Sequence, residues 1–76
     1  MNASINQLEV RTDLTIRKGS VVTLDLHGDG KPIEVKVDEI TMSNGNIFIE
    51  SYTTGYGCLL THSADQYRRS GTLIKY

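Results

Sequence analysis

Apolar and polar residues alternate along most of this chain, and the alternation predicts a succession of short β-strands. In the first quarter of the chain, four apolar residues share one parity: Leu8, Val10, Leu14 and Ile16. A period of two places one face of a strand in the core and the other in water. We expect one strand here, or two short strands interrupted near residues 11–13. A helix opened by a capping box at residues 4–7 is disfavoured, because β-branched residues follow it.

Further strand-like runs follow, separated by residues that favour turns. They cover residues 20–26, 32–40, 47–52, 58–62 and 71–76. Gly19 can adopt the positive φ of a tight turn, and Asn44-Gly45 between two alternating runs favours a type I′ hairpin. Residues 63–67 have the length of a single helical turn, with Ser63 as its N-cap. The segment HGDGKP at residues 27–32 reads as a hairpin turn, since no helix follows to complete a phosphate-binding loop.

This order of elements predicts an all-β fold, a five- to six-stranded antiparallel meander with one 3₁₀ or helical turn before the last strand. From about residue 14 to residue 76, the order resembles that of the SH3-like small barrels, in which a final strand closes a meander after one such turn. The resemblance rests on element order and turn chemistry. The aromatic and acidic loop of the peptide-binding SH3 barrels has no counterpart here. A small open sheet that dimerises through an edge strand is the alternative.

Length and charge narrow the possible roles. The 76 residues suffice for one domain, in which residues 1–13 form a peripheral strand or a flexible arm. A chain this short buries about 60–65% of its unfolded surface, which leaves little room for a deep substrate cavity. A net charge of −1 argues against strongly electrostatic binding of nucleic acid. No apolar run reaches the length of a membrane span, and no secretory leader is recognisable, so we expect a cytoplasmic protein.

The residues that usually carry catalysis or bind metals are sparse. Cys58 and His62 lie four residues apart, a separation of about 13 Å along a strand, which is beyond hydrogen-bonding distance. The single Cys58 excludes an internal disulfide, and we expect it to be a small core residue. One cysteine and two histidines do not supply the paired ligands of a zinc site, so we predict neither a metal nor a cofactor. Asp38 and Glu39 point to opposite faces of a strand unless a bulge intervenes.

One candidate binding surface lies near the carboxyl end, where basic and aromatic residues interleave. Its members are Tyr67, Arg68, Arg69, Lys75 and Tyr76. Arginine can form paired hydrogen bonds with phosphate or carboxylate, and a tyrosine ring can stack on a nucleobase. In the structural interpretation, which we favour, Tyr67 packs inward and both arginines project into water.

A second candidate surface contains Phe48, Tyr52 and Tyr56, on a strand and the turn after it. Exposed rings are typical of protein contact surfaces, because they bring a large area at a modest cost in entropy. The chain has four tyrosines, one phenylalanine and no tryptophan, so one of the three rings must fill the core. We expect that ring to be Phe48.

Together these features predict a non-enzymatic binding module with no membrane contact. Our first hypothesis is protein–protein interaction with an unknown partner, as an adaptor, a subunit or a small inhibitor. The second is nucleic-acid binding through Tyr67, Arg68 and Arg69. The third is an oligomeric enzyme with its site on a symmetry axis, similar to the plasmid-type dihydrofolate reductases, although the chain does not match their active-site pattern. A homodimer formed through an edge strand is compatible with each hypothesis.

Overall fold

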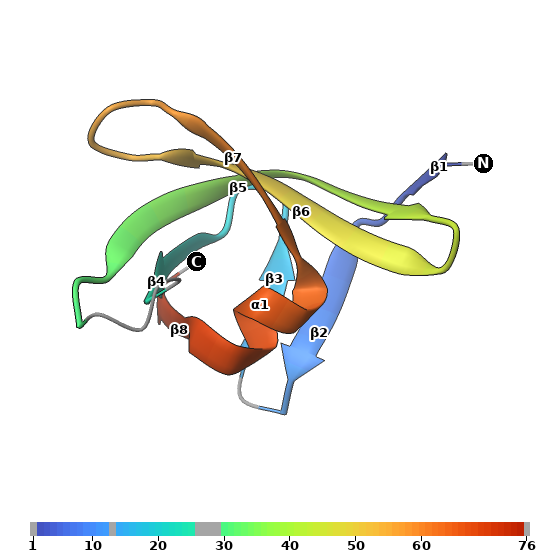
Figure 1. Cartoon of the computed structure of the whole chain (residues 1–76), viewed down its shortest axis with the longest axis horizontal. Coiled ribbons are helices and arrows are strands. Elements are labelled where there is room, and N and C mark those ends of the chain that lie inside the picture. The colour runs from blue at the N-terminus through green and yellow to red at the C-terminus, as the bar shows by residue number, and fades with distance from the viewer. Residues whose placement is uncertain (1, 13, 26–29, 76) are drawn as a thin grey trace.

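The structure is a computed structural model that describes residues 2–12, 14–25 and 30–75 (Figure 1). Within these residues, antiparallel strands dominate and one short helix precedes the last strand. The elements are β1 (Asn2–Ser4), β2 (Gln7–Arg11), β3 (Leu14–Arg17), β4 (Val21–Leu24), β5 (Ile33–Ser43), β6 (Asn46–Thr53), β7 (Leu59–Ser63), α1 (Ala64–Ser70) and β8 (Gly71–Lys75). The mostly β, antiparallel fold predicted from the alternation is therefore confirmed.

The larger sheet has the strand order β7-β6-β5-β4-β8, and β2 and β3 form a separate antiparallel pair. Strand β5 is long enough to pair with two strands along the same edge, with β4 near its start and with β1 near its end. Figure 1 shows the curved layer of β5, β6 and β7 above α1, β8 and the β2–β3 hairpin. Among the described residues no pairing joins β7 to β8, so hydrogen bonds do not close the sheet into a barrel.

A bulge in β5 changes the parity of its buried residues. The pairing with β6 shifts between Val37 and Glu39. Val35 and Val37 are buried before the shift, and Ile40 is buried after it. A bulge bends its strand and increases the local twist, which matches the curvature of β5 in Figure 1. Simple alternation thus accounts for the burial of Val35 and Val37 but not for that of Ile40.

Two turns have the backbone conformations that the sequence predicts. Asn44 and Gly45 have φ of 53° and 80°, as a type I′ turn requires between β5 and β6. Gly19 has φ of 89° between β3 and β4. Residues 27–29 of the predicted HGDGKP turn lie outside the described residues, but Leu24 and Ile33 on either side of the turn are antiparallel partners.

The core lies between the curved layer and the elements beneath it. Its buried apolar residues are Val10, Leu14, Ile16, Val22, Leu24, Val35, Val37, Ile40, Ile49, Ala64 and Tyr67. Three of them, Val10, Leu14 and Ile16, come from β2 and β3, which therefore supply part of the core. This matters for a short chain, because its stability depends on a small number of buried side chains.

The ring that fills the core is Tyr67, and the prediction that Phe48 would do so is wrong. Tyr67 is fully buried on α1, whereas Phe48 is 37% exposed on β6. The side chains of Ile47 and Ile49 point toward the core, so Phe48 between them points outward. Cys58 is also exposed, contrary to prediction, because it lies in the connection before β7 rather than inside the strand.

The start of α1 is capped as the sequence predicts. The Gln66 backbone N–H donates to Ser63 Oγ at 3.4 Å. The Ser63 N–H in turn donates to Gln66 Oε1 at 3.1 Å, which completes a capping box. This cap fixes the direction in which the chain leaves β7, and thereby points Tyr67 into the core.

Candidate functional site

The outer face of the curved layer, opposite the core, carries exposed apolar side chains. Lys36 on β5 lies opposite Tyr52 on β6, and Tyr52 lies opposite Leu59 on β7. Tyr52 is 40% exposed and Leu59 is 51% exposed. Side chains directly opposite each other on one face of an antiparallel pair lie within contact distance. Tyr52 and Leu59 therefore lie side by side in one cross-strand row, and Lys36 is the next residue of that row.

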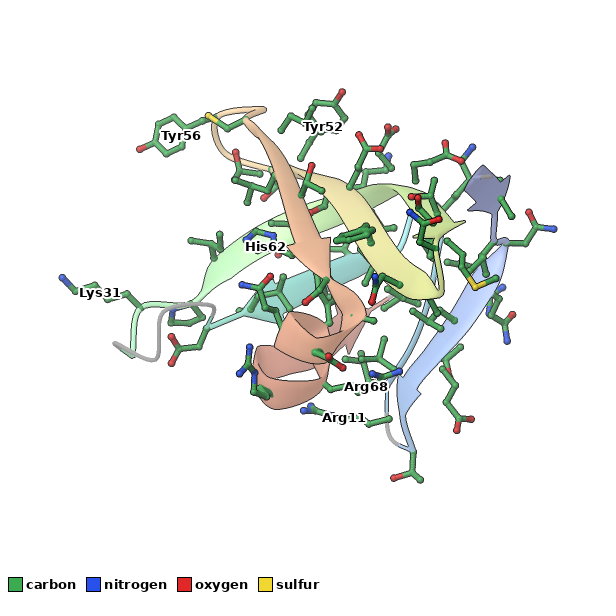
Figure 2. The ribbon with its side chains drawn as sticks, turned by 45° about the vertical axis from the view of Figure 1, so that its right-hand side comes forward. Arg11, Lys31, Tyr52, Tyr56, His62 and Arg68 are labelled. Carbon is green, nitrogen blue, oxygen red and sulfur yellow. The ribbon has the colours of Figure 1, made fainter. Side chains whose placement is uncertain are left out.

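The turn between β6 and β7 carries a third exposed side chain on the same arm. Tyr56 is 92% exposed. The turn that carries it is tied down, because the Thr53 N–H donates to the Cys58 carbonyl at 3.0 Å and the Gly57 N–H donates to the Thr53 carbonyl at 2.8 Å. Figure 2 shows both tyrosines projecting from the β6–β7 arm into solvent. We call Tyr52, Tyr56 and Leu59 the aromatic hairpin surface.

Further hydrogen bonds join this arm to β5. The Thr54 N–H donates to the Glu34 carbonyl at 3.1 Å, and Thr54 Oγ1 donates to Glu34 Oε1 at 2.8 Å. The Cys58 N–H donates to Thr53 Oγ1 at 3.0 Å. The aromatic hairpin surface is thus held by an ordered turn, and a partner that binds it would have little chain to immobilise.

A basic hollow adjoins Tyr52 on its β5 side. It measures about 270 Å³ and is lined by Lys18, Gly19, Lys36, Val37, Asp38 and Tyr52. A second hollow of about 320 Å³, lined by residues 17–20, shares Lys18 and Gly19 with it. The positive charge here is partly balanced, since Lys18 Nζ lies 3.4 Å from Glu39 Oε2.

Glu39 is committed to local contacts and does not form an acid–base pair with Asp38. The sequence predicted that these two carboxylates point to opposite faces unless a bulge intervenes, and β5 does have a bulge between Val37 and Glu39. However, Ser4 Oγ donates to Glu39 Oε1 at 2.6 Å, and Lys18 lies against the other carboxylate oxygen. The Ser4 hydrogen bond and then the charge of Lys18 lower the pKa of Glu39, so this carboxyl stays ionised.

The structure separates the residues of the predicted carboxyl-terminal cluster. Tyr67 is fully buried, and its hydroxyl donates to Ser51 Oγ at 3.2 Å. Burial raises the pKa of Tyr67, against a smaller opposing effect of the Ser51 hydrogen bond. The ring is therefore not available for stacking, as the structural interpretation expected. The side chain of Lys75 and all of Tyr76 lie outside the described residues.

Arg68 joins two elements of the fold. Its Nε donates to the Val10 carbonyl on β2 at 3.0 Å, and its Nη1 lies 2.6 Å from Asp65 Oδ1. Arg11 Nη1 donates to the Arg68 carbonyl at 3.2 Å, and Figure 2 shows these two arginines next to each other. One hydrogen bond from the Arg68 side chain and one to its backbone carbonyl thus attach α1 to β2, whereas the Asp65 contact lies within α1. Both arginines are exposed, and Arg69 is the next residue of α1.

A third hollow, of about 290 Å³, lies where the β5–β6 turn meets α1. Its lining consists of Gly45, Asn46, Ile47, Phe48, Ser63, Ala64, Asp65 and Arg68. Ile47 and Phe48 are its apolar lining residues, and Asp65 and Arg68 form an ion pair in the same lining. This hollow is separate from the aromatic hairpin surface, because Phe48 lies opposite Thr41 of β5 whereas Tyr52 lies opposite Lys36.

Of the predicted site residues, Tyr52 and Tyr56 are exposed on the same β6–β7 arm, whereas the burial of Tyr67 removes the ring from a basic aromatic patch with Arg68 and Arg69. Leu59 belongs to the aromatic hairpin surface and was missed in the sequence. The signal was present, because Leu59 and Leu60 are consecutive in a strand and must point to opposite faces. One of the two leucines therefore had to be exposed.

The described residues contain no group of three or more histidine, cysteine, aspartate or glutamate side chains that could hold a metal ion. Nor does any helix among them have the length and hydropathy to cross a membrane. No protein-family profile, curated protein or solved structure matches this chain.

Proposed function

We propose that this chain is a non-enzymatic protein-binding module that contacts its partner through the aromatic hairpin surface. The observation that carries the proposal is the grouping of Tyr52, Tyr56 and Leu59, all exposed, on one hydrogen-bonded arm. Tyrosine is enriched in binding hot spots because its ring buries apolar area while its hydroxyl still forms a hydrogen bond. Burying such side chains stabilises a complex by about 25 cal/mol per Å² of apolar area, less the cost of association.

The architecture that presents this surface is, in our proposal, a half-open small barrel of the SH3-like kind. The support is the strand order β7-β6-β5-β4-β8 together with the placement of α1 directly before β8. In this arrangement β4 and β8 hold one end of the curved layer while the β6–β7 arm extends from the other. A role as an adaptor, a subunit or a small inhibitor suits a surface this small, and the free Cys58 suits the cytoplasm.

Affinity purification with matched variants tests the proposal. The tagged protein should recover a stoichiometric partner from its native cells, identified by mass spectrometry. The triple variant Tyr52→Ser, Tyr56→Ser and Leu59→Ser should lose that partner while keeping the circular dichroism spectrum of the parent. The control is Met42→Ser with Phe48→Ser, which removes similarly exposed apolar side chains elsewhere on β5 and β6. Retention of the partner by the triple variant would refute the proposal.

The basic hollow next to Tyr52 favours a second candidate function, binding of single-stranded nucleic acid. Lys18 and Lys36 would contact phosphates while the Tyr52 ring stacks on a base. Asp38 in the same lining and Glu39 beside Lys18 oppose this function. If it holds, oligonucleotide affinity falls with salt by a logarithmic slope of about 0.7 per phosphate contact, and Lys18→Ala with Lys36→Ala abolishes binding. The pair Arg68→Ala and Arg69→Ala tests the predicted patch in the same titration.

A further inference from the structure

One edge of β7 faces away from β6 and has no neighbouring strand among the described residues. The Thr53 N–H donates to the Cys58 carbonyl, so Cys58 presents its backbone groups to β6. Hydrogen-bonded and non-hydrogen-bonded pairs alternate along an antiparallel ladder. The backbone groups of Leu60 therefore face β6, whereas those of Leu59 and Thr61 face away from it. Since β7 is the end of the strand order, no described strand pairs with these outward groups.

The edge of β7 also lacks the usual protection against pairing. Exposed edges commonly carry charged residues, proline or a bulge that prevents another strand from adding to them. The sequence of β7, LLTHS, contains no lysine, arginine, aspartate, glutamate or proline, and its pairing with β6 has no register shift. The other edge strands are charged, as β2, β3 and β8 are, or short, as the three-residue β1 is.

We propose that β7 pairs antiparallel with β7 of a second copy of this chain, forming a two-fold symmetric dimer centred on Leu60. In this register Leu59 of each copy exchanges hydrogen bonds with Thr61 of the other, so every outward backbone group of these two residues finds a partner. The two Leu60 side chains meet on the inner face, where a non-hydrogen-bonded pair has a Cα separation of about 4.5 Å.

The position of α1 favours a pairing centred on Leu60 over a pairing centred on Thr61. Centring the pair on Thr61 would require Ser63 to bond with Leu59 of the second copy. The Ser63 N–H already donates to Gln66 Oε1, and α1 begins at the next residue. Only Leu59 and Thr61 therefore offer outward backbone groups for pairing, and in a two-fold arrangement each of them pairs with the other. A short edge of this kind favours an identical copy as the partner over a longer strand of another protein.

The dimer goes beyond the proposed function, because it doubles the number of binding surfaces that one particle presents. Joining the two β7 strands makes one continuous sheet of the two curved layers. Tyr52 and Leu59 of both copies then lie on the same outer face, so the dimer presents two aromatic hairpin surfaces to a partner. Two linked sites raise the overall affinity for a bivalent partner without any new contact.

Sedimentation of the purified chain in reducing buffer, over a wide concentration range, tests this assembly. We expect a reversible equilibrium between monomer and dimer. Thr61→Pro removes an outward N–H without breaking the ladder with β6, and should weaken dimerisation by roughly tenfold or more. Thr61→Lys, which keeps the backbone donor and places like charges near each other across the interface, should also weaken it. Asn6→Lys adds the same charge away from β7 and should leave dimerisation unchanged.

Cross-linking then tests the register. In a Cys58→Ser background, Leu60→Cys should form an intermolecular disulfide more readily than Thr61→Cys. A monomer at every concentration, a dimer that resists both Thr61 variants, or a larger assembly from pairing of β7 with β8 would overturn the proposal. Faster cross-linking of Thr61→Cys would overturn the register. Because the chain is the only protein present, these results do not depend on whether the proposed partner exists.

Discussion

On the inner face of the β5–β6–β7 layer, Tyr67 is fully buried and its hydroxyl bonds to Ser51, whereas on the outer face Tyr52 is 40% exposed and Tyr56 is 92% exposed. The same type of side chain therefore stabilises the fold on one face and remains available for contacts on the other. The difference lies in what covers each face. The inner face is covered by α1 and the β2–β3 hairpin, and no described element covers the outer face.

The largest expected difference between the two faces is in stability. Tyr67→Ala leaves a cavity at the centre of the core and should lower the free energy of unfolding by about 3–5 kcal/mol. That is close to the whole stability of a domain this small, so the variant should be largely unfolded by circular dichroism. Tyr52→Ala should change stability by no more than about 0.5 kcal/mol in urea denaturation. Similar losses for both variants would show that the two faces do not differ as described.

The two adjacent arginines of α1 provide a second comparison. Arg68→Ala removes the bond from Nε to the Val10 carbonyl and should lower the free energy of unfolding by about 1–2 kcal/mol, because a bond from a charged donor is lost. Arg69→Ala should remain within about 0.5 kcal/mol of the parent. Chemical denaturation of both variants measures the difference. If Arg69→Ala proves equally costly, the attachment of α1 to β2 does not rest on Arg68.

Alkaline pH should weaken the inner face through Tyr67. Its pKa is raised in the folded state by burial, so the phenolate forms more easily in the unfolded chain. The stability that this group contributes is complete below its unfolded pKa of about 10, and is lost as pH rises through the folded pKa. The stability advantage of the parent over Tyr67→Phe should shrink above about pH 10. A constant difference across that range would contradict the burial of the phenol.

The smallest expected effect lies at the exposed carboxyl of Glu39. Its pKa is lowered in the folded state by the Ser4 hydrogen bond and by Lys18, so its contribution to stability is present above the ordinary pKa of 4.5. The contribution is lost as pH falls through the folded pKa. The melting temperature of Glu39→Gln should therefore fall less than that of the parent as the pH is lowered through this range. The control is Glu9→Gln, at an exposed carboxyl of β2, whose melting temperature should fall with pH as that of the parent does.

Local patterns in the sequence were sufficient to predict most elements of the fold. The parity of Leu8, Val10, Leu14 and Ile16 predicts β2 and β3, Asn44-Gly45 predicts the β5–β6 hairpin, and Ser63 predicts the cap of α1. Each of these signals acts over a few residues, through φ, side-chain parity or a single hydrogen bond. They are therefore readable without knowing what lies next to them in space.

The assignment of rings to core and surface depended on tertiary structure. Sequence reasoning placed Phe48 and Cys58 inside, and the structure exposes both, whereas the inward packing of Tyr67 that it favoured is found. A bulge near Asp38 shifts the buried parity of β5, and Arg68 turns out to attach α1 to β2. Alternation determines which side chains share a face, because that is a property of the local backbone. Which face becomes the core is decided by the distant segments that pack against it, and here those are α1 and the β2–β3 hairpin.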